Sequence, residues 1–117
     1  MMTAMDDARD YLPLSAQQFH ILLALSDAER HGYGILLEIA ERTSGAMRLG
    51  TGTLYTAIAG LEDDDLIGEA APRRGERDDR RKYYRLTPLG RRVLRAETAR
   101  LESLVKHARQ KGIQPAW

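Results

Sequence analysis

LGTGTLYTAIAGLEDDDLI, residues 49–67, has the pattern of a short helix followed at once by a strand. At about 100° per residue, Leu54, Ile58 and Leu61 fall on one narrow apolar stripe. The opposite side carries mainly small residues, where an ordinary surface helix would carry Lys, Glu or Gln. Such a helix can approach a bulky partner, and the DNA major groove is wide enough to accept an α-helix. Burial of the helix on two sides within its own domain explains the pattern equally well.

The start of this helix is the candidate nucleic-acid contact. We expect Gly50 or Thr51 to cap it, and the free amides of its first turn would bind a phosphate. Capping is the simpler role of the threonine hydroxyls, and the two roles are compatible. The residues expected to contact DNA from this helix are Thr51, Gly52, Thr53, Tyr55, Thr56 and Ala59.

Two further helices are expected before this one. Ser15 is a suitable N-cap for a helix over residues 15–26, because its hydroxyl can accept from unpaired first-turn amides. Apolar spacing predicts a second helix over residues 33–43. His31, in the connection, is interpreted as a helix-end cap or a surface residue rather than a catalytic group. Three short helices in succession are typical of a helix-turn-helix.

Two extended runs follow, at residues 66–71 and 82–86, and the loop PRRGERDDRR joins them. Pro and Gly turn the chain in this loop, so the sequence predicts a β-hairpin, or wing. Arginines on such a tip suit phosphate or minor-groove contact. A solvated hairpin whose Arg and Asp side chains pair with one another fits the composition as well. The expected wing contacts are Arg73, Arg74, Arg77, Arg80, Arg81 and Lys82.

The start of the last helix is predicted by Thr87 at the N-cap and by Pro88 at the first helical position. It is expected to run to residue 110, with Gly112 as its terminator. Its apolar residues follow a spacing that favours pairing with a second copy of the chain. Packing back on its own domain is the alternative. The expected dimer contacts are Phe19, Leu23, Leu94, Leu101, Leu104, Val105 and Ala108.

Charge is divided unevenly along the 117 residues. Residues 1–71 contain 4 Lys and Arg against 12 Asp and Glu, whereas residues 72–117 contain 14 against 5. The split suggests a polyanionic partner, although self-association between acidic and basic faces also accounts for it. A membrane span needs roughly 18 consecutive apolar residues, and none occurs. With no secretory signal and no cysteine, a cytoplasmic location is expected.

No catalytic or metal-binding pattern is visible. The three His residues are far apart and match no zinc motif, and no spacing suggests a nucleophile with its base. Four adjacent acids, residues 62–65, end the central helix. Hard-metal loops place carboxylates at alternate, turning positions, so this run is interpreted as solvated charge. We therefore expect no enzyme activity, no metal and no cofactor.

With these elements placed, the chain resembles the PadR family of winged helix-turn-helix transcriptional regulators. The resemblance covers residues 12–108. It rests on four motifs: HGYGI at 31–35, GTLYTAI at 52–58, LEDDDLI at 61–67 and RRKYYRLTPLGRRVL at 80–94. It implies that residues 52–55 open the recognition helix, that residues 83–85 build the second wing strand, and that residues 87–94 start a dimerising helix. It further implies a homodimeric repressor that releases a pseudo-palindromic operator when an effector or stress acts.

Two departures from the family pattern matter. Family members often carry Arg or Lys near Thr56, Ala59 and Gly60, and this chain has none there. The expected affinity therefore shifts toward the wing arginines and the helix amides. Where Asp65 stands, relatives tend to have Gly, but Asp tolerates a left-handed conformation. The chain resembles short family members without a separate effector domain, so a small-molecule effector would have to bind at the dimer interface.

The expected fold is mainly α with a small β-hairpin. It comprises a flexible arm (1–11), a winged helix-turn-helix domain (12–86), a dimerisation helix (87–112) and a tail (113–117). The expected function is sequence-specific DNA binding by a homodimeric transcriptional repressor. The alternative is a winged-helix protein-interaction module without DNA binding, which the uncharged outer face of the central helix and the acids at its end favour.

Overall fold

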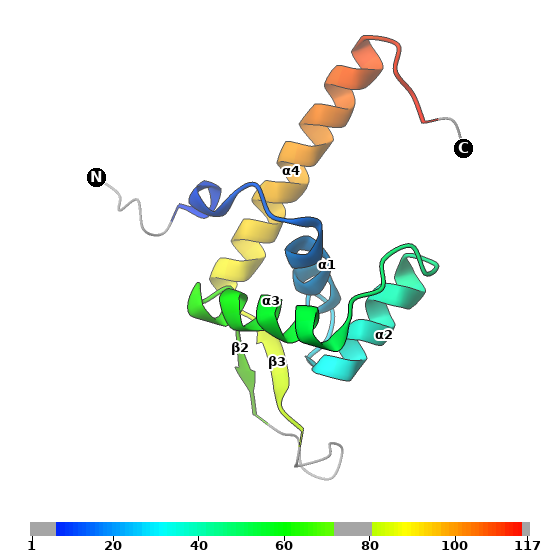
Figure 1. Ribbon diagram of the computed structural model, residues 1–117. Coiled ribbons are helices and arrows are strands. Elements are labelled where there is room, and N and C mark those ends of the chain that lie inside the picture. Colours follow the sequence, from blue (N-terminus) through cyan, green and yellow to red (C-terminus); the bar gives the residue numbers. More distant parts are fainter. Residues whose placement is uncertain (1–6, 72–80, 116–117) are drawn as a thin grey trace.

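In the computed structural model, which describes residues 7–71 and 81–115, helices pack together and a small antiparallel sheet projects from one side of them (Figure 1). The elements are η2 (Ala8–Tyr11), α1 (Ala16–Ala24), β1 (Arg30–His31), α2 (Gly32–Arg42), α3 (Thr51–Asp63), β2 (Ile67–Ala70), β3 (Tyr83–Leu86) and α4 (Pro88–Gln110). In Figure 1, α3 crosses the front of the domain, β2 and β3 project below it, and the second half of α4 extends beyond the domain on the opposite side. The expected fold class is confirmed.

The helix starts follow from their capping residues. The Ser15 hydroxyl accepts from the Gln18 amide, and the Gln18 side chain accepts from the Ser15 N–H. This reciprocal cap satisfies two donors that the helix itself cannot pair. At α4, the Thr87 hydroxyl accepts from the Gly90 amide, and Pro88 occupies the first turn. Both predicted starts are confirmed.

The apolar stripe of α3 forms the centre of the core. Leu54, Ile58 and Leu61 are at most 1% exposed. The other helices add further fully buried side chains, namely Ile21, Leu22, Ile35, Ile39 and Val93. The opposite side of α3 is exposed along the helix. The structure therefore rejects burial of α3 on two sides among the described residues of this chain.

The sheet has three strands in the order β1-β3-β2, where the sequence predicted two. In the register, His31 pairs with Tyr83, and Ala70 pairs with Tyr83 from the other side. β1 was not predicted, because a strand of two residues is too short to show an alternation of apolar and polar residues. Side chains alternate across β3, since Tyr84 is 4% exposed and its neighbour Tyr83 is partly exposed. Because β1 leads directly into α2, the sheet ties the base of the hairpin to the start of that helix.

The turn from α3 into β2 is held by α4. Asp65 has a φ of 59°, which confirms the predicted left-handed conformation. The Thr87 hydroxyl donates to the carbonyls of Asp65 and Leu66, at 2.7 and 3.0 Å. Gly90 lies against the same backbone, since a Cβ there would be 2.0 Å from the Leu66 carbonyl oxygen. Only glycine permits this approach, which sets the position of α4 against the end of α3.

The N-terminal segment, expected as a flexible arm over residues 1–11, is described from residue 7 onward. Residues 1–6 lie outside the described residues, but Ala8–Tyr11 form a 3₁₀ helix that packs against α4. The Leu14 amide donates to Glu97 at 3.0 Å, and Arg100 donates to the same carboxylate at 2.6 Å. Glu97 is 2% exposed. Its hydrogen bonds from Arg100 lower its pKa, so it stays ionised and fixes the segment to α4.

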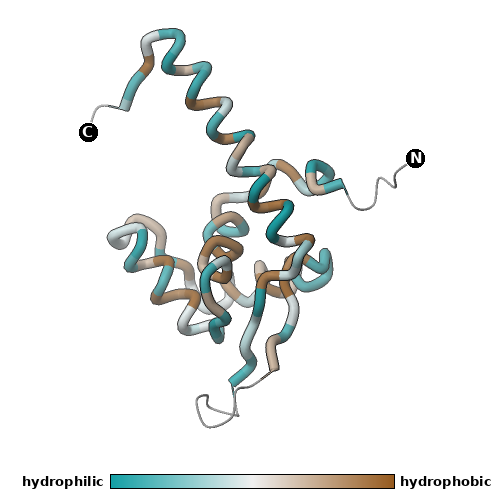
Figure 2. The backbone as a smooth tube through the Cα atoms, turned by 180° about the vertical axis from the view of Figure 1, so that it is seen from behind, coloured by the Kyte–Doolittle hydropathy of each residue, from teal (hydrophilic) through white to brown (hydrophobic). Residues whose placement is uncertain are grey.

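The two halves of α4 have different surroundings. Leu94, expected at a dimer interface, is 7% exposed within the core of its own chain. The first half of α4 packs on α1, so its apolar side is already used there. Further along, Leu104 and Val105 are 51% and 49% exposed. Figure 2 shows hydrophobic residues spaced along this free half. Gly112 has a φ of 82°, as expected of a helix terminator.

Of the remaining expected dimer contacts, Phe19 and Leu23 pack partly buried against the core. Leu101 and Ala108 on α4 are also partly exposed. The exposed apolar residues of α4 are therefore confined to its second half.

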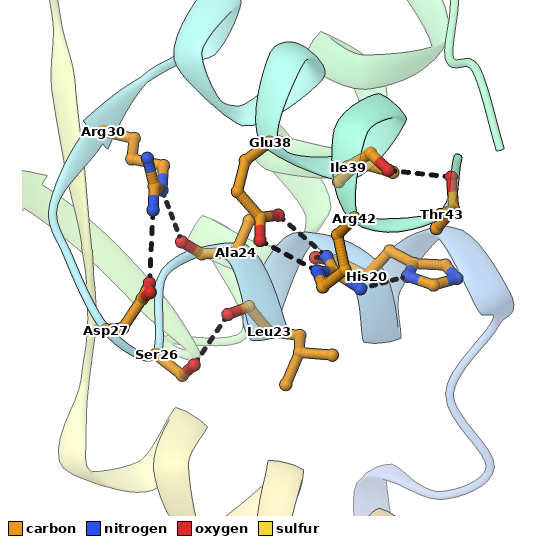
Figure 3. Close-up of polar contacts among 10 residues, drawn as sticks. All are labelled: His20, Leu23, Ala24, Ser26, Asp27, Arg30, Glu38, Ile39, Arg42 and Thr43. Carbon is orange, nitrogen blue, oxygen red and sulfur yellow. Dashed lines mark hydrogen bonds and ion pairs between the residues drawn. The ribbon is translucent and has the colours of Figure 1, made fainter. Parts of the chain in front are cut away.

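Polar contacts join α1 to α2 (Figure 3). Arg42 donates to the His20 ring nitrogen Nδ1 at 2.9 Å and to the His20 carbonyl at 3.2 Å. The same guanidinium pairs with Glu38 at 2.8 Å. Burial, and then the Arg42 charge, lower the pKa of His20. The neutral imidazole thus accepts the arginine proton and helps to hold the two helices together.

Candidate nucleic-acid interface

The exposed side of α3, called here the open face, carries no charged side chain over most of its length. It consists of Thr51, Gly52, Thr53, Tyr55, Thr56, Ala59 and Gly60, all of them exposed. Gly50 caps the helix without any side-chain hydrogen bond to the first turn. A Cβ at Gly52 or Gly60 would meet nothing within 4 Å. Another molecule can therefore approach the helix backbone closely.

A groove runs between the open face and the start of α1. Its volume is about 600 Å³. From α1 it is lined by Ser15, Gln17 and Gln18, and from α3 mainly by Gly52, Thr53 and Thr56. Hydroxyl and amide groups alternate with glycines and Ala57 in this lining, so the groove offers both hydrogen bonds and apolar contact to a partner. The contribution of α1 was not visible in the sequence, because α1 and α3 are far apart along the chain.

Tyr55 leaves the open face toward the start of α2. A Cβ at Gly32 would lie 2.1 Å from the Tyr55 hydroxyl oxygen and 2.6 Å from the ring carbon that carries it. The tyrosine therefore rests on the glycine, while 45% of it remains exposed. The first glycine of the HGYG motif thus sets the position of a residue on the neighbouring helix, a relation that the sequence analysis missed.

A second hollow, called here the tyrosine pocket, has a volume of about 330 Å³. The start of α2 contributes His31, Gly32 and Tyr33. The opposite wall is formed by Tyr55 from α3 and by Arg81, Lys82 and Tyr84 from β3 and the residues before it. The ammonium group of Lys82 lies 3.6 Å from a Glu62 carboxylate oxygen and 5.6 Å from the centre of the Tyr84 ring. α3 and the base of the hairpin therefore meet at one cationic, aromatic pocket.

His31 caps α2, as one of the two sequence interpretations held. Its Nδ1 accepts from the Gly34 amide at 3.0 Å. Its ring packs edge-on against Tyr83, with 5.1 Å between the ring centres. Arg81 places a guanidinium nitrogen 2.8 Å from Nε2. His31 therefore links the start of α2 to the base of the hairpin.

The expected DNA contacts divide into two groups. All six residues from α3 lie together on the open face, and Arg81 and Lys82 lie beside Tyr55 in the tyrosine pocket. The other four wing arginines, at positions 73, 74, 77 and 80, fall outside the described residues. The acids Asp63 and Asp64 are exposed at the far end of α3. The sequence assigned no DNA contact to Tyr33 or Tyr84; Tyr33 lies at the start of α2, and Tyr84 reaches the pocket through the pairing of β3 with β1.

Other kinds of site find no support in the part of the chain that the structure describes. Over residues 7–71 and 81–115, no three His, Asp or Glu side chains gather closely enough to hold a metal ion. No described helix is both long and apolar enough to cross a membrane.

Three helices followed by a β-hairpin, with the third helix exposed along one side, define the winged helix-turn-helix class of DNA-binding regulators. The chain belongs to the transcriptional regulator PadR-like family, whose family model matches residues 21–96. Family and fold are those of transcription regulators rather than of enzymes.

Two relatives illustrate the similarity. An uncharacterised 37.1 kDa protein in transposon TN4556 of Streptomyces fradiae is 42% identical over 80 residues. That match covers 68% of this chain but only 21% of the relative, so this chain spans about a fifth of that protein. The transcriptional regulator Rv3488 of Mycobacterium tuberculosis is 33% identical over 92 residues, covering 79% of this chain and 81% of the relative.

Solved structures show the same architecture. A PadR family transcription regulator from Clostridium difficile R20291 superposes with a TM-score of 0.69 at 26% identity, covering 82% of this chain and 97% of that one. Bacillus subtilis PadR in complex with operator DNA superposes with a TM-score of 0.59 at 23% identity. That superposition covers 70% of this chain and 47% of the Bacillus protein, and it shows the fold alone.

Proposed function

We propose that this regulator is a homodimeric repressor that binds a pseudo-palindromic DNA operator through the open face of α3. The observation that carries the proposal is that this face is uncovered and is flanked by a groove with hydroxyl and amide groups on one side and by a cationic pocket on the other. The Bacillus structure, in which a protein of the same fold is bound to operator DNA, supports DNA as the partner.

Small residues on α3 would let the helix lie deep in the major groove. The hydroxyls of Thr53 and Thr56 can bind base edges and phosphates, and their methyl groups can contact the methyl group of thymine. Tyr55 extends beyond the helix surface and is half exposed. Because no Arg or Lys lies on the open face, bidentate readout of guanine from this helix is absent. Specificity would therefore depend on close approach, on hydroxyl and methyl contacts, and on DNA shape.

Phosphate contacts would come from the hairpin and its base. Arg81 and Lys82 lie at that base beside Tyr55, and the hairpin loop adds Arg73, Arg74, Arg77 and Arg80. Neutralisation of about six phosphates per dimer gives a slope of log K against log salt near −5. A clearly shallower slope would contradict the role of the hairpin as the electrostatic anchor.

The dimer would form through the second half of α4. Leu101, Leu104, Val105 and Ala108 lie on that half, and two of them are about half exposed. An exposed apolar helix face of this kind is covered when a second copy packs against it. Recognition helices about 34 Å apart would then meet successive turns of the major groove. A small effector that relieves repression would bind at this interface.

The test combines assembly with DNA binding. Sedimentation of the purified protein should give a dimer, and gel-shift with the DNA upstream of its own gene should give a discrete, sequence-dependent complex. Selection of bound fragments from genomic DNA would then define the operator, and transcription from it in vitro should fall when the protein is added. A strictly monomeric protein would overturn the arrangement.

A protein-interaction module is the second candidate, and the charge of α3 favours it. The open face lacks cations, and Asp63 and Asp64 are exposed beside it. An acidic end of this kind repels phosphates. Absence of any salt-dependent duplex binding, together with burial of the open face against another protein, would support this candidate over the repressor.

A further inference from the structure

We propose that the tyrosine pocket binds one phosphate of the DNA backbone, with Tyr84, Lys82 and the first turn of α2 as the binding groups. This site extends the interface beyond the residues found by sequence analysis, and it rests on the proposed DNA-binding function. In this site, one phosphate would be contacted at the same time by the start of α2, by the base of the hairpin and by the neighbourhood of Tyr55 on α3.

The start of α2 makes one wall of the pocket favourable for an anion. The first amides of any helix have no partner within the helix, and the helix dipole is positive at that end. His31 accepts from the Gly34 amide, and this is the one side-chain cap of that turn among the described residues. Gly32 and Tyr33 precede Gly34 and line the pocket. A phosphate there would meet both the dipole and these amides.

Tyr84 provides the second, independent indication of a ligand. Its side chain is 4% exposed, and its hydroxyl forms no hydrogen bond with any described residue. No buried polar side-chain atom among those residues lacks a partner, so this hydroxyl is not sealed in the core. It lines the pocket instead, as an unpaired donor on a buried ring. Burial, followed by the nearby Glu62 charge, raises the pKa of Tyr84, so the hydroxyl keeps its proton.

Lys82 supplies the charge that a phosphate requires. Its ammonium group pairs loosely with Glu62 at 3.6 Å, and its side chain remains 48% exposed. A long side chain held this weakly can turn toward an anion that enters the pocket. Arg81, beside the His31 ring, adds a second positive charge to the same rim.

The location of the pocket favours DNA over a free anion. Tyr55 belongs both to the pocket and to the open face of α3. A duplex whose major groove receives α3 would carry one backbone past Tyr55 toward the hairpin, which lies below α3 in Figure 1. The phosphates of that strand pass over the pocket.

The test compares Tyr84→Phe with Tyr11→Phe on a random-sequence duplex of about 30 base pairs at low salt. Tyr84→Phe removes one hydroxyl and keeps the buried ring, so thermal unfolding should change little. Its affinity should fall about tenfold for each pocket that contacts DNA, as expected for loss of a hydrogen bond to a charged group. Tyr11 lies in η2, away from the pocket, and its variant should bind like the wild type. Lys82→Gln should make the salt slope shallower by about one per pocket.

The outcomes separate the pocket from the proposed function. Steep, salt-dependent binding by the wild type with unchanged affinity in Tyr84→Phe overturns the pocket and leaves the DNA-binding proposal intact. No duplex binding by the wild type overturns both. The alternative is that the pocket binds a free phosphate rather than DNA. Titration with inorganic phosphate tests this alternative, with binding monitored through the backbone amide signals of Gly32 and Tyr33 in NMR spectra. Strong binding of free phosphate with DNA affinity unaffected by Tyr84→Phe identifies a small-anion site and refutes a DNA contact.

A substituted operator identifies the contact as a phosphate. Once an operator is selected, single phosphates are replaced by neutral methylphosphonate. One position in each half-site should weaken wild-type binding but have little further effect on Tyr84→Phe, because the same interaction is already lost. Equal effects of every position on both proteins would contradict the assignment.

Discussion

Gly32→Ala is expected to displace Tyr55 without unfolding the domain. The added Cβ would lie 2.1 Å from the tyrosine hydroxyl oxygen and 2.6 Å from the adjoining ring carbon. Non-bonded carbon and oxygen atoms need about 3.5 Å, so the end of the ring must move by roughly 1 Å or more. It can move because Tyr55 is 45% exposed. In the proposed complex, the displaced hydroxyl would no longer meet the DNA in its native position.

The cost in folding stability is expected to be small. Replacement of Gly by Ala at a compatible backbone position stabilises by about 0.4–1 kcal/mol, which offsets the lost contact with the ring. Thermal unfolding should therefore shift by only a few degrees. Gly34→Ala is the matched control in the same helix, since a Cβ there would lie 3.5 Å from the nearest His31 atom, an ordinary contact.

The assay is a double-mutant cycle on DNA affinity. We expect Gly32→Ala to weaken binding about tenfold, comparable to loss of one tyrosine hydrogen bond to a charged group. Tyr55→Ala should weaken it at least as much. In the Tyr55→Ala background, Gly32→Ala should add nothing, because its whole effect passes through the ring. An undiminished effect in that background, or an equal loss in Gly34→Ala, would refute the reasoning.

Three further predictions follow from contacts elsewhere in the fold. The lowered pKa of His20 means that the unfolded chain takes up a proton first as pH falls. Stability should then decline below about pH 6.5, and His20→Gln should flatten that decline in denaturant titrations; an unchanged decline in the variant would contradict the role of His20. Gly90→Ala puts a methyl group 2.0 Å from the Leu66 carbonyl oxygen. It should destabilise by about 3 kcal/mol or more in urea unfolding, and a neutral effect would mean that α4 can shift freely. Leu104→Lys should convert the dimer into monomers in sedimentation while unfolding of each monomer is unchanged, because this side chain is 51% exposed. Persistence of the dimer would place the interface elsewhere.

Much of the candidate site could be predicted because it lies on one helix. The helical period of 3.6 residues places Leu54, Ile58 and Leu61 on one face and most of the residues between them on the other. The apolar face is the one that is buried. The exposed residues of α3 were therefore identified from order along the chain alone.

The remainder of the site depends on contacts between distant residues. Tyr55 meets Gly32 across 23 positions of sequence, and Tyr84 reaches the pocket because β3 pairs with the two-residue strand β1. Neither relation leaves a periodic pattern in the chain. The hydroxyl of Tyr84 became a candidate only when its burial and its missing partner were both known.

Local sequence was sufficient to place helices α1 to α4, the caps at Ser15 and Thr87, and the hairpin, because each depends on residues within a few positions of one another. Tertiary structure alone decided which apolar residues of α4 are free, since Leu94 and Leu104 share one helix but differ in what packs against them. It also decided that Glu97 holds the N-terminal segment through a hydrogen bond spanning 83 residues. Local preferences are set by neighbouring side chains, whereas burial and pairing are set by the whole fold.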